Sequence, residues 1–275
     1  MSGGSTGPSA PVGVFDSGIG GLTVVRALRA RLPRESIVYF GDTARVPYGT
    51  KSPETITRFA LQDADFLVAR GVKLVVVACH SASSVALHEL TRRVEVPVVG
   101  VIEPGARAVV AATKRRRVGV IGTAATIASA AYERAIRALD PAIEILARPT
   151  PLFVPLAEEG WHEGEVAESA ARRYLDGFRE EGIDALLLGC THFPLLAPVI
   201  GRTLGPEVTL VDSSEETAAR AAAVLTEAGL LNPDGPARHR CYLSDLTPSS
   251  EKVAARFLGS APGEIVRASV AGGDR

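Results

Sequence analysis

Short apolar runs alternate with longer amphipathic stretches over most of this chain. The runs are too short for helices and suit strands buried on both faces, whereas the stretches between them show the spacing of helices that cover a sheet. The pattern predicts repeated strand–helix units on parallel sheets. We expect strands at residues 12–15, 36–40, 73–78, 97–101, 117–121, 143–147, 184–188 and 208–211.

The pattern also repeats within the chain. A strand that begins near Gly13 is followed by an apolar run that ends at Cys79, and a strand that begins near Gly119 is followed by a run that ends at Cys190. From glycine to cysteine the two spacings, 13 to 79 and 119 to 190, are about equal in length. We therefore predict an α/β fold of two parallel-sheet domains related by pseudo-symmetry, with the active site in the cleft between them.

Turn residues and composition set the expected limits of these domains. The first residues are rich in Gly, Ser and Pro and lack the basic start and apolar centre of a signal peptide, so we expect a disordered leader. Beyond the second domain, one helix at residues 215–228 and one strand near residues 240–243 are expected to pack back on the first domain. The limits are then residues 1–11 for the leader, 12–104 for domain 1, 105–213 for domain 2 and 214–270 for the C-terminal segment.

Charge and cysteine content restrict the possible partners and compartment. The chain has 275 residues and a formal net charge of −1, which gives no reason to expect nucleic acid or a membrane as a partner. Three cysteines are too few and uneven for a disulfide framework, which favours a reducing compartment such as the cytoplasm. We expect a small-molecule substrate instead.

Two of the cysteines stand where parallel sheets place their ligands, at the carboxyl ends of strands. Cys79 is followed by His80 and Ser81, and Cys190 is followed by Thr191 and His192. A thiol with a pKa of about 8.5 becomes a thiolate after a small shift, which the N–H groups of a following helix can supply. Two thiols that face each other can remove a proton from one face of a carbon and deliver one to the other face.

Simpler interpretations of the same residues remain open. A cysteine at a strand end is often only a small buried hydrophobe, as we expect for Cys241, and Asp16 can be a helix cap. The glycines at 18, 20 and 21 suggest a phosphate loop, but Thr23 occupies the last glycine position of that motif. A zinc hydrolase with ligands Cys79, His80, Cys190 and His192 is disfavoured, because neighbouring side chains at a strand end diverge.

Three segments carry a resemblance to a known family. They are residues 13–24 (GVFDSGIGGLTV), 39–49 (YFGDTARVPYG) and 188–196 (LGCTHFPLL). In this order they resemble the glutamate racemases of the aspartate/glutamate racemase family. The resemblance implies a cofactor-independent enzyme that interconverts L- and D-glutamate and supplies D-glutamate for peptidoglycan, and hence for the cell wall and cell shape. It also implies a homodimer.

The resemblance assigns roles to individual residues of this chain. Cys79 and Cys190 are the two bases, with Asp16, His192 and Glu158 as their helpers. The substrate contacts are Asp16, Ser17, Pro47, Tyr48, Gly49, His80, Ser81, Thr123, Thr191 and His192. No metal is implied. Pyridoxal is not required either, because none of the four lysines at 51, 73, 114 and 252 lies at a strand end suited to a Schiff base.

His80 departs from the family pattern, which usually has Asn at this position. Its imidazolium could stabilise the Cys79 thiolate, or its ring could turn away and only pack. Two alternative functions also stay open. The chain could racemise aspartate or another amino acid, or it could be a binding or regulatory relative that has lost turnover.

Overall fold

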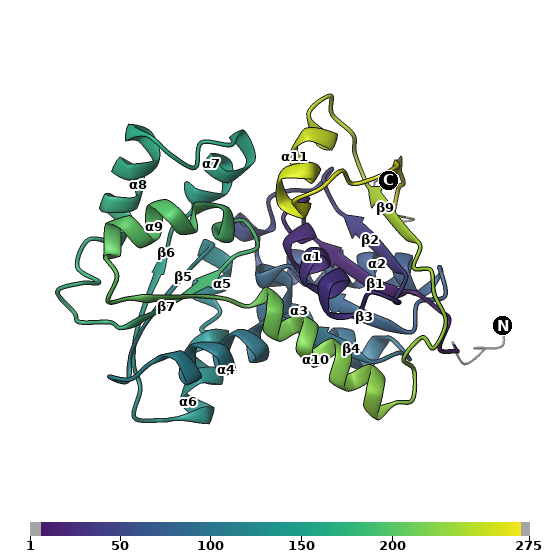
Figure 1. Ribbon diagram of the computed structural model, residues 1–275, viewed down its shortest axis with the longest axis horizontal. Coiled ribbons are helices and arrows are strands. Elements are labelled where there is room, and N and C mark those ends of the chain that lie inside the picture. The colour runs from purple at the N-terminus through teal and green to yellow at the C-terminus, as the bar shows by residue number, and fades with distance from the viewer. Residues whose placement is uncertain (1–6, 271–275) are drawn as a thin grey trace.

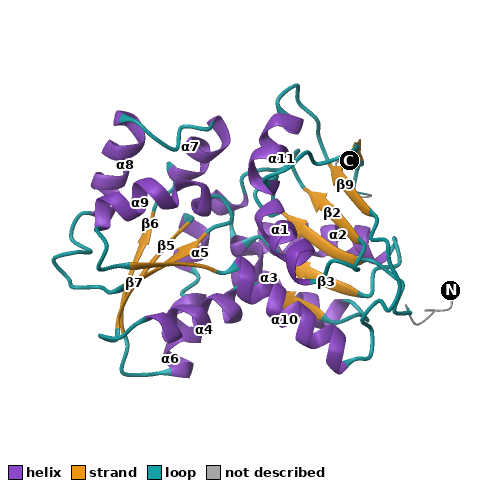
Figure 2. Cartoon of the chain, viewed as in Figure 1, coloured by secondary structure: helices purple, strands orange, loops and turns teal. Residues whose placement is uncertain are grey.

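The computed structural model describes residues 7–270 and consists of two α/β domains, each built on a parallel sheet with helices on both faces (Figures 1 and 2). This confirms the predicted fold class. The central strands of both sheets are buried along their whole length, which explains why they are apolar runs without alternation.

The first sheet has six parallel strands in the order β10-β9-β2-β1-β3-β4. Four of them come from the first part of the chain and two from the C-terminal segment. Their bounds are Val12–Asp16 (β1), Ile37–Gly41 (β2), Leu74–Val77 (β3), Val98–Gly100 (β4), His239–Leu243 (β9) and Ile265–Arg267 (β10).

The second sheet has four parallel strands in the order β6-β5-β7-β8. Their bounds are Arg117–Gly122 (β5), Glu144–Pro149 (β6), Ala185–Gly189 (β7) and Thr209–Asp212 (β8). The order repeats that of β2-β1-β3-β4 in the first sheet, so the predicted pseudo-symmetry is visible in the topology. The eight strands predicted in the two domains are present within two residues of their expected limits, and the strand predicted near residues 240–243 is β9; of the strands within residues 7–270, only the three-residue β10 was not predicted.

Helices form a layer on each face of both sheets (Figure 2). In the first domain α1 (Leu22–Arg31) packs with α10 (Ser214–Glu227) and α11 (Ser250–Leu258), and α2 (Pro53–Val68) packs with α3 (His80–Arg93). In the second, α4 (Ile102–Ala112) packs with α6 (Ala131–Leu139), and α8 (Glu165–Leu175) packs with α9 (Ala197–Leu204). Shorter helices are α5 (Ala124–Ala128), α7 (Phe153–Glu159), η1 (Tyr48–Thr50) and η2 (Phe193–Leu196).

The C-terminal segment returns to the first domain. Strand β9 pairs with β2, with Tyr39 opposite Cys241, and α10 packs on α1. Cys241 is a buried strand residue with a free thiol. The predicted domain limits remain predictions, and the join expected at residues 104–105 falls within the first turn of α4.

The predicted leader stays a prediction, and only its last residues lie within the described part of the chain. Residues 1–6 lie outside the described residues, but residues 7–11 lie against the first domain. The carbonyl of Pro8 accepts a hydrogen bond from the ammonium of Lys73, which also pairs with Glu35 at 2.6 Å. Among residues 7–270 we find no helix with the length and hydropathy needed to span a bilayer.

Candidate active site

The predicted site residues meet where the two sheets present the carboxyl ends of their strands to each other. In both sheets the strand order reverses between the first and third strands, and this is where open α/β sheets bind ligands. Asp16 ends β1 and Cys79 follows β3, while Thr123 follows β5 and Cys190 follows β7. The topology therefore delivers one thiol from each domain to the same place.

A small cavity of about 30 Å³ lies at this junction. It is lined by every predicted site residue except Glu158: Asp16, Ser17, Pro47, Tyr48, Gly49, Cys79, His80, Ser81, Thr123, Cys190, Thr191 and His192. Val46 and Val154 also line it. Glu158 does not line the cavity but contacts His192, which does.

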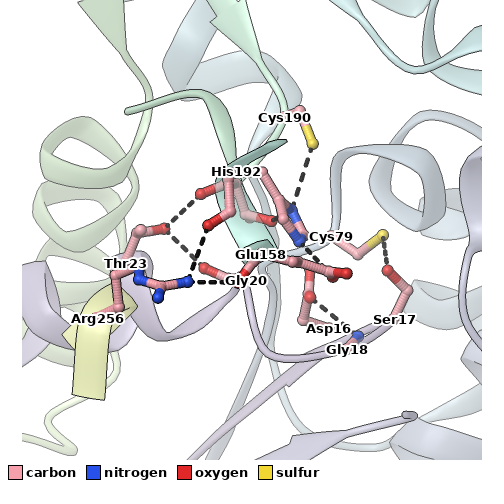
Figure 3. A network of polar contacts seen from close by, with 12 residues as sticks. Asp16, Ser17, Gly18, Gly20, Thr23, Cys79, Glu158, Cys190, His192 and Arg256 are labelled. Atoms are coloured by element: carbon pink, nitrogen blue, oxygen red, sulfur yellow. Dashed lines mark hydrogen bonds and ion pairs between the residues drawn. The ribbon is translucent and has the colours of Figure 1, made fainter. Parts of the chain in front are cut away.

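Cys190 lies beside a histidine that is held from both sides (Figure 3). Nδ1 of His192 is 3.7 Å from the Cys190 sulfur, and Nε2 is 3.0 Å from Oε1 of Glu158. Burial by itself would lower the pKa of His192, but the hydrogen bonds and charges of Cys190 and Glu158 outweigh it and raise this pKa to about 10. His192 therefore stands beside the Cys190 sulfur as an imidazolium at neutral pH.

Cys79 has the opposite surroundings. It is the N-cap of α3, its sulfur lies 3.5 Å from the N–H of Ala82, and it is 3.6 Å from the hydroxyl of Ser17. Burial and the negative charge of Asp16 nevertheless raise the pKa of Cys79 to about 12. The expected lowering by the helix N-terminus is therefore outweighed on this side, and Cys79 rests as a neutral thiol.

Asp16 is buried between the two thiol environments. Its Oδ2 accepts a hydrogen bond from the N–H of Gly18 at 3.0 Å, whereas Oδ1 has no hydrogen-bond partner among the described residues. Burial raises the pKa of Asp16, while the positive charge of His192 and the N–H groups of Gly18 and Gly21 act in the opposite direction. Oδ1 of Asp16 can thus accept a hydrogen bond from a further donor.

Hydroxyl groups join the two domains beside the cavity. The Ser81 and Thr123 hydroxyl oxygens are 2.9 Å apart, and the Thr123 hydroxyl also accepts a hydrogen bond from the N–H of Thr126 as the cap of α5. A side chain at position 49 would clash with the other domain, since a Cβ there would lie 2.6 Å from the Cβ of Thr123. The closeness of the domains thus requires glycine at position 49.

Tyr48 lines the cavity, but its hydroxyl is engaged in the core of the first domain. This oxygen contacts Asp42 and lies 2.8 Å from Oδ2 of Asp63, and Arg45 pairs with both carboxylates. Burial and the charge of Asp42 raise the pKa of Asp63 well above its usual range. No signal in the sequence marks Asp63, because it lies within α2 like any other polar helix residue.

His80 packs between the domains. Its Nδ1 is 2.8 Å from the Tyr132 hydroxyl and its Nε2 is 3.4 Å from the Ser213 hydroxyl. Burial, together with the positive charge of His192, lowers the pKa of His80 to about 3. A neutral imidazole gives Cys79 no cationic partner, so these contacts favour the second of the two sequence interpretations, in which the ring turns away and packs.

The glycine-rich turn and the residues considered as zinc ligands serve the contact between the domains. A Cβ on Gly20 would lie 2.4 Å from the Thr191 hydroxyl and 2.6 Å from the His192 ring, so this glycine permits close domain contact and does not form a phosphate loop. Because His80 binds Tyr132, the four residues considered for zinc do not converge. Within residues 7–270 no group of three or more His, Cys, Asp or Glu side chains is arranged to hold a metal ion.

Comparison with known proteins identifies the family of this chain. Residues 22–221 match the family Asp/Glu/Hydantoin racemase. The chain belongs to this racemase family. A glutamate racemase from Geobacter metallireducens is 54% identical over 96% of this chain and 98% of the relative.

Solved structures of the racemase family share the whole fold. The crystal structure of glutamate racemase from Francisella tularensis in complex with D-glutamate has a TM-score of 0.91 and 40% identity, covering 96% of this chain and 99% of that one. The glutamate racemase from Thermus thermophilus in complex with β-chloro-D-alanine has a TM-score of 0.87 and 48% identity, covering 96% and 98%. The two-domain architecture is therefore that of the glutamate racemases.

Proposed function

We propose that this chain interconverts L- and D-glutamate with Cys79 and Cys190 as a pair of bases and without a cofactor. The observation that carries the proposal is that one thiol from each domain lines the same buried cavity, one beside a cation and the other beside an anion. Inversion at a carbon requires a base on one face and a proton donor on the other, and a pair of thiols can share these two roles.

The reaction balances with the two thiols alone. The thiolate of Cys190 takes the Cα proton and becomes a thiol, and the electrons of the broken C–H bond move into the substrate carboxylate. The thiol of Cys79 then gives its proton to the opposite face of Cα, a new C–H bond forms, and Cys79 is left as a thiolate. The other enantiomer reacts in the reverse order, with Cys79 as the base.

The surrounding groups suit a substrate with two carboxylates and an ammonium. The hydroxyls of Ser17, Ser81, Thr123 and Thr191 line the cavity and can donate to carboxylate oxygens. The buried Oδ1 of Asp16, which has no hydrogen-bond partner within residues 7–270, can accept a hydrogen bond from an ammonium. Glutamate is favoured over aspartate because the relatives named above are glutamate racemases, one of them bound to D-glutamate.

We place this activity in the cytoplasm, where it would supply D-glutamate for peptidoglycan and so for cell-wall synthesis and cell shape. The three free cysteines support a reducing compartment. We also propose a homodimer, as the family resemblance implies. Light scattering that finds only fully active monomers at micromolar concentration would remove the dimer from the proposal.

The proposed activity is tested by incubating the purified chain with L-glutamate, D-glutamate and, in parallel, L-aspartate, and by following optical rotation. We expect both glutamate enantiomers to approach zero rotation and aspartate to change much more slowly. Deuterium uptake at Cα in D₂O separates an enzyme from a binding relative. If aspartate racemises faster, the substrate assignment is wrong; if no amino acid exchanges its Cα proton, the enzyme assignment is wrong.

A further inference from the structure

Glu158 lies near the end of a short helix. It is the second-last residue of α7, which spans only Phe153–Glu159, and its carboxylate gives His192 a hydrogen bond partner on the side away from Cys190. The last carbonyls of a helix have no partners within it, so a short helix depends on outside donors to fix its end. The geometry of the His192–Glu158 pair therefore depends on what holds the end of α7.

Arg256 supplies those donors from the other domain. It lies on α11 of the C-terminal segment, and its Nη1 donates to the carbonyls of both Ala157, at 3.2 Å, and Glu158 (Figure 3). Gly160, the left-handed residue that ends α7, leaves room for the guanidinium, since a Cβ there would lie 2.6 Å from Nη2. A cation at a helix C-terminus is also favoured by the helix dipole.

The next residue of α11 contacts the other member of the pair. The buried ring of Phe257 meets the His192 ring edge to face, with the ring centres 5.0 Å apart. Consecutive residues of one first-domain helix thus contact His192 and the end of the helix that carries Glu158. The C-terminal segment, which packs in the first domain, thus contacts the part of the site that the second domain supplies.

Glu158 has room to leave His192 if this support is lost. Its side chain is 39% exposed and borders a cavity of about 270 Å³ that Arg256 and Lys252 also line. The contact of Glu158 with His192 therefore depends on the position of the end of α7, and the bonds from Arg256 are among the contacts that fix this end.

We propose that Arg256 is a positioning residue for the racemase reaction: by fixing the end of α7 it holds Glu158 on His192 and so supports Cys190 as a base. The inference rests on the proposed function. The titratable groups that face His192 are Cys190, Glu158 and, from β1, Asp16; His80 also faces it but is neutral. Of these, Glu158 is the one that Arg256 holds.

The test compares Arg256→Met, which keeps the apolar stem and removes the donors, with Arg256→Lys and with the control Lys252→Met. Lys252 lies one turn away on the same helix and borders the same cavity but, within residues 7–270, makes no hydrogen bond to α7. We expect kcat/KM to fall between about 10-fold and 100-fold in Arg256→Met, to recover in part in Arg256→Lys, and to stay within about twofold of wild type in the control.

Isotope effects locate the damaged step. Because enantiomers have equal free energies, kcat/KM must fall equally in both directions. With glutamate deuterated at Cα, however, Arg256→Met should increase the isotope effect for the enantiomer that Cys190 deprotonates and decrease it for the other. In a Glu158→Gln background, Arg256→Met should add little further loss, because both changes remove the same support.

Two results would overturn the proposal. One is a loss in Arg256→Met that is as large in the Glu158→Gln background as in wild type. The other is a lower melting temperature with unchanged isotope effects, which would make Arg256 merely structural. A separate readout is independent of activity: NMR titration should show the imidazolium of His192 losing its proton at lower pH in Arg256→Met than in wild type. If wild type fails to racemise glutamate, the proposed function is wrong. The NMR titration still tests whether Arg256 holds Glu158 on His192.

Discussion

The two thiols of this site have opposite neighbours. His192, with its pKa raised to about 10, faces Cys190 as a cation, whereas Asp16 faces Cys79 and helps to raise the pKa of that thiol to about 12. The two cysteines occupy equivalent positions in the pseudo-symmetric fold, but the side chains beside them differ. The site is therefore symmetric in its backbone and asymmetric in the charges that surround the two thiols.

We expect Cys79→Ser and Cys190→Ser each to abolish racemisation, with losses of at least about 1,000-fold, because a serine hydroxyl is far too weak a base. Racemisation is followed by optical rotation, and Cα exchange by NMR in D₂O. Cys79→Ser should still exchange the proton of one enantiomer through Cys190. Cys190→Ser should exchange the other more slowly, since Cys79 rests as a thiol. Near-normal turnover in either variant would eliminate the two-thiol mechanism.

The effect of His80 on the stability of the folded chain gives a second test at the level of single residues. In the unfolded chain His80 takes up a proton near pH 6.5, whereas in the folded chain its pKa is about 3. Its contribution to stability is thus complete above pH 6.5 and is lost as the pH falls toward 3. Between pH 7.5 and pH 5 wild type should lose about 2 kcal/mol more unfolding free energy than His80→Asn, measured by urea denaturation.

A matched control is available at position 88. The imidazole of His88 is 77% exposed, so His88→Asn should follow wild type at both pH values. The pH–rate profiles of wild type and His80→Asn should superimpose between pH 6 and 9, because the imidazole is neutral throughout. Equal acid sensitivity of wild type and His80→Asn, or a displaced rate profile, would show that His80 carries a proton in the folded chain.

At the scale of elements, the turn between β1 and α1 governs how closely the domains meet. Its glycines permit the loop after β7 to approach, as the contact distances at Gly20 show. The Thr23 hydroxyl, at the start of α1, lies 3.4 Å from the carbonyl of Thr191. This turn is therefore part of the domain contact as well as of the site.

Gly20→Ala should lower kcat/KM by about 100-fold, because its methyl group would displace Thr191 and His192 from their working positions. The melting temperature should change little, since the domains can move apart to accept the methyl group. Gly18→Ala is the control in the same turn, because there the nearest atom to a Cβ is 3.5 Å away, on Val46. Similar losses in both variants would mean that the turn itself, and not domain contact, is sensitive.

At the scale of the whole molecule, the site is nearly closed. A cavity of about 30 Å³ holds roughly one water molecule and is much too small for a dicarboxylic amino acid. The two domains must therefore separate for substrate to enter. The contacts that have to break include the hydroxyl pair Ser81–Thr123.

Hydrogen exchange measures this opening. We expect saturating glutamate to slow amide exchange in the facing loops, residues 17–21 and 189–193, by up to about 100-fold at a concentration of 100 times Kd. Helix α8 lies away from the cavity and should show no local protection. Unchanged exchange in both loops at saturation would contradict entry by domain separation.

The sequence by itself determined the strands, their repetition and most of the site. Buried parallel strands must be apolar and end in short polar turns, so local pattern locates both the strands and the residues that follow them, including both cysteines and Asp16. The family motifs added Glu158 and the proposed substrate contacts. The family motifs also singled out His80 as a departure.

Only the tertiary structure decided how these residues are charged and held. The raised pKa of Cys79 comes from burial against Asp16, and the orientation of His80 comes from Tyr132, 52 residues away in the other domain. Arg256 reaches α7 across 98 residues and Asp63 reaches Tyr48 across 15. Burial and contacts between distant residues follow from how helices and domains pack, and no local pattern of residues records them.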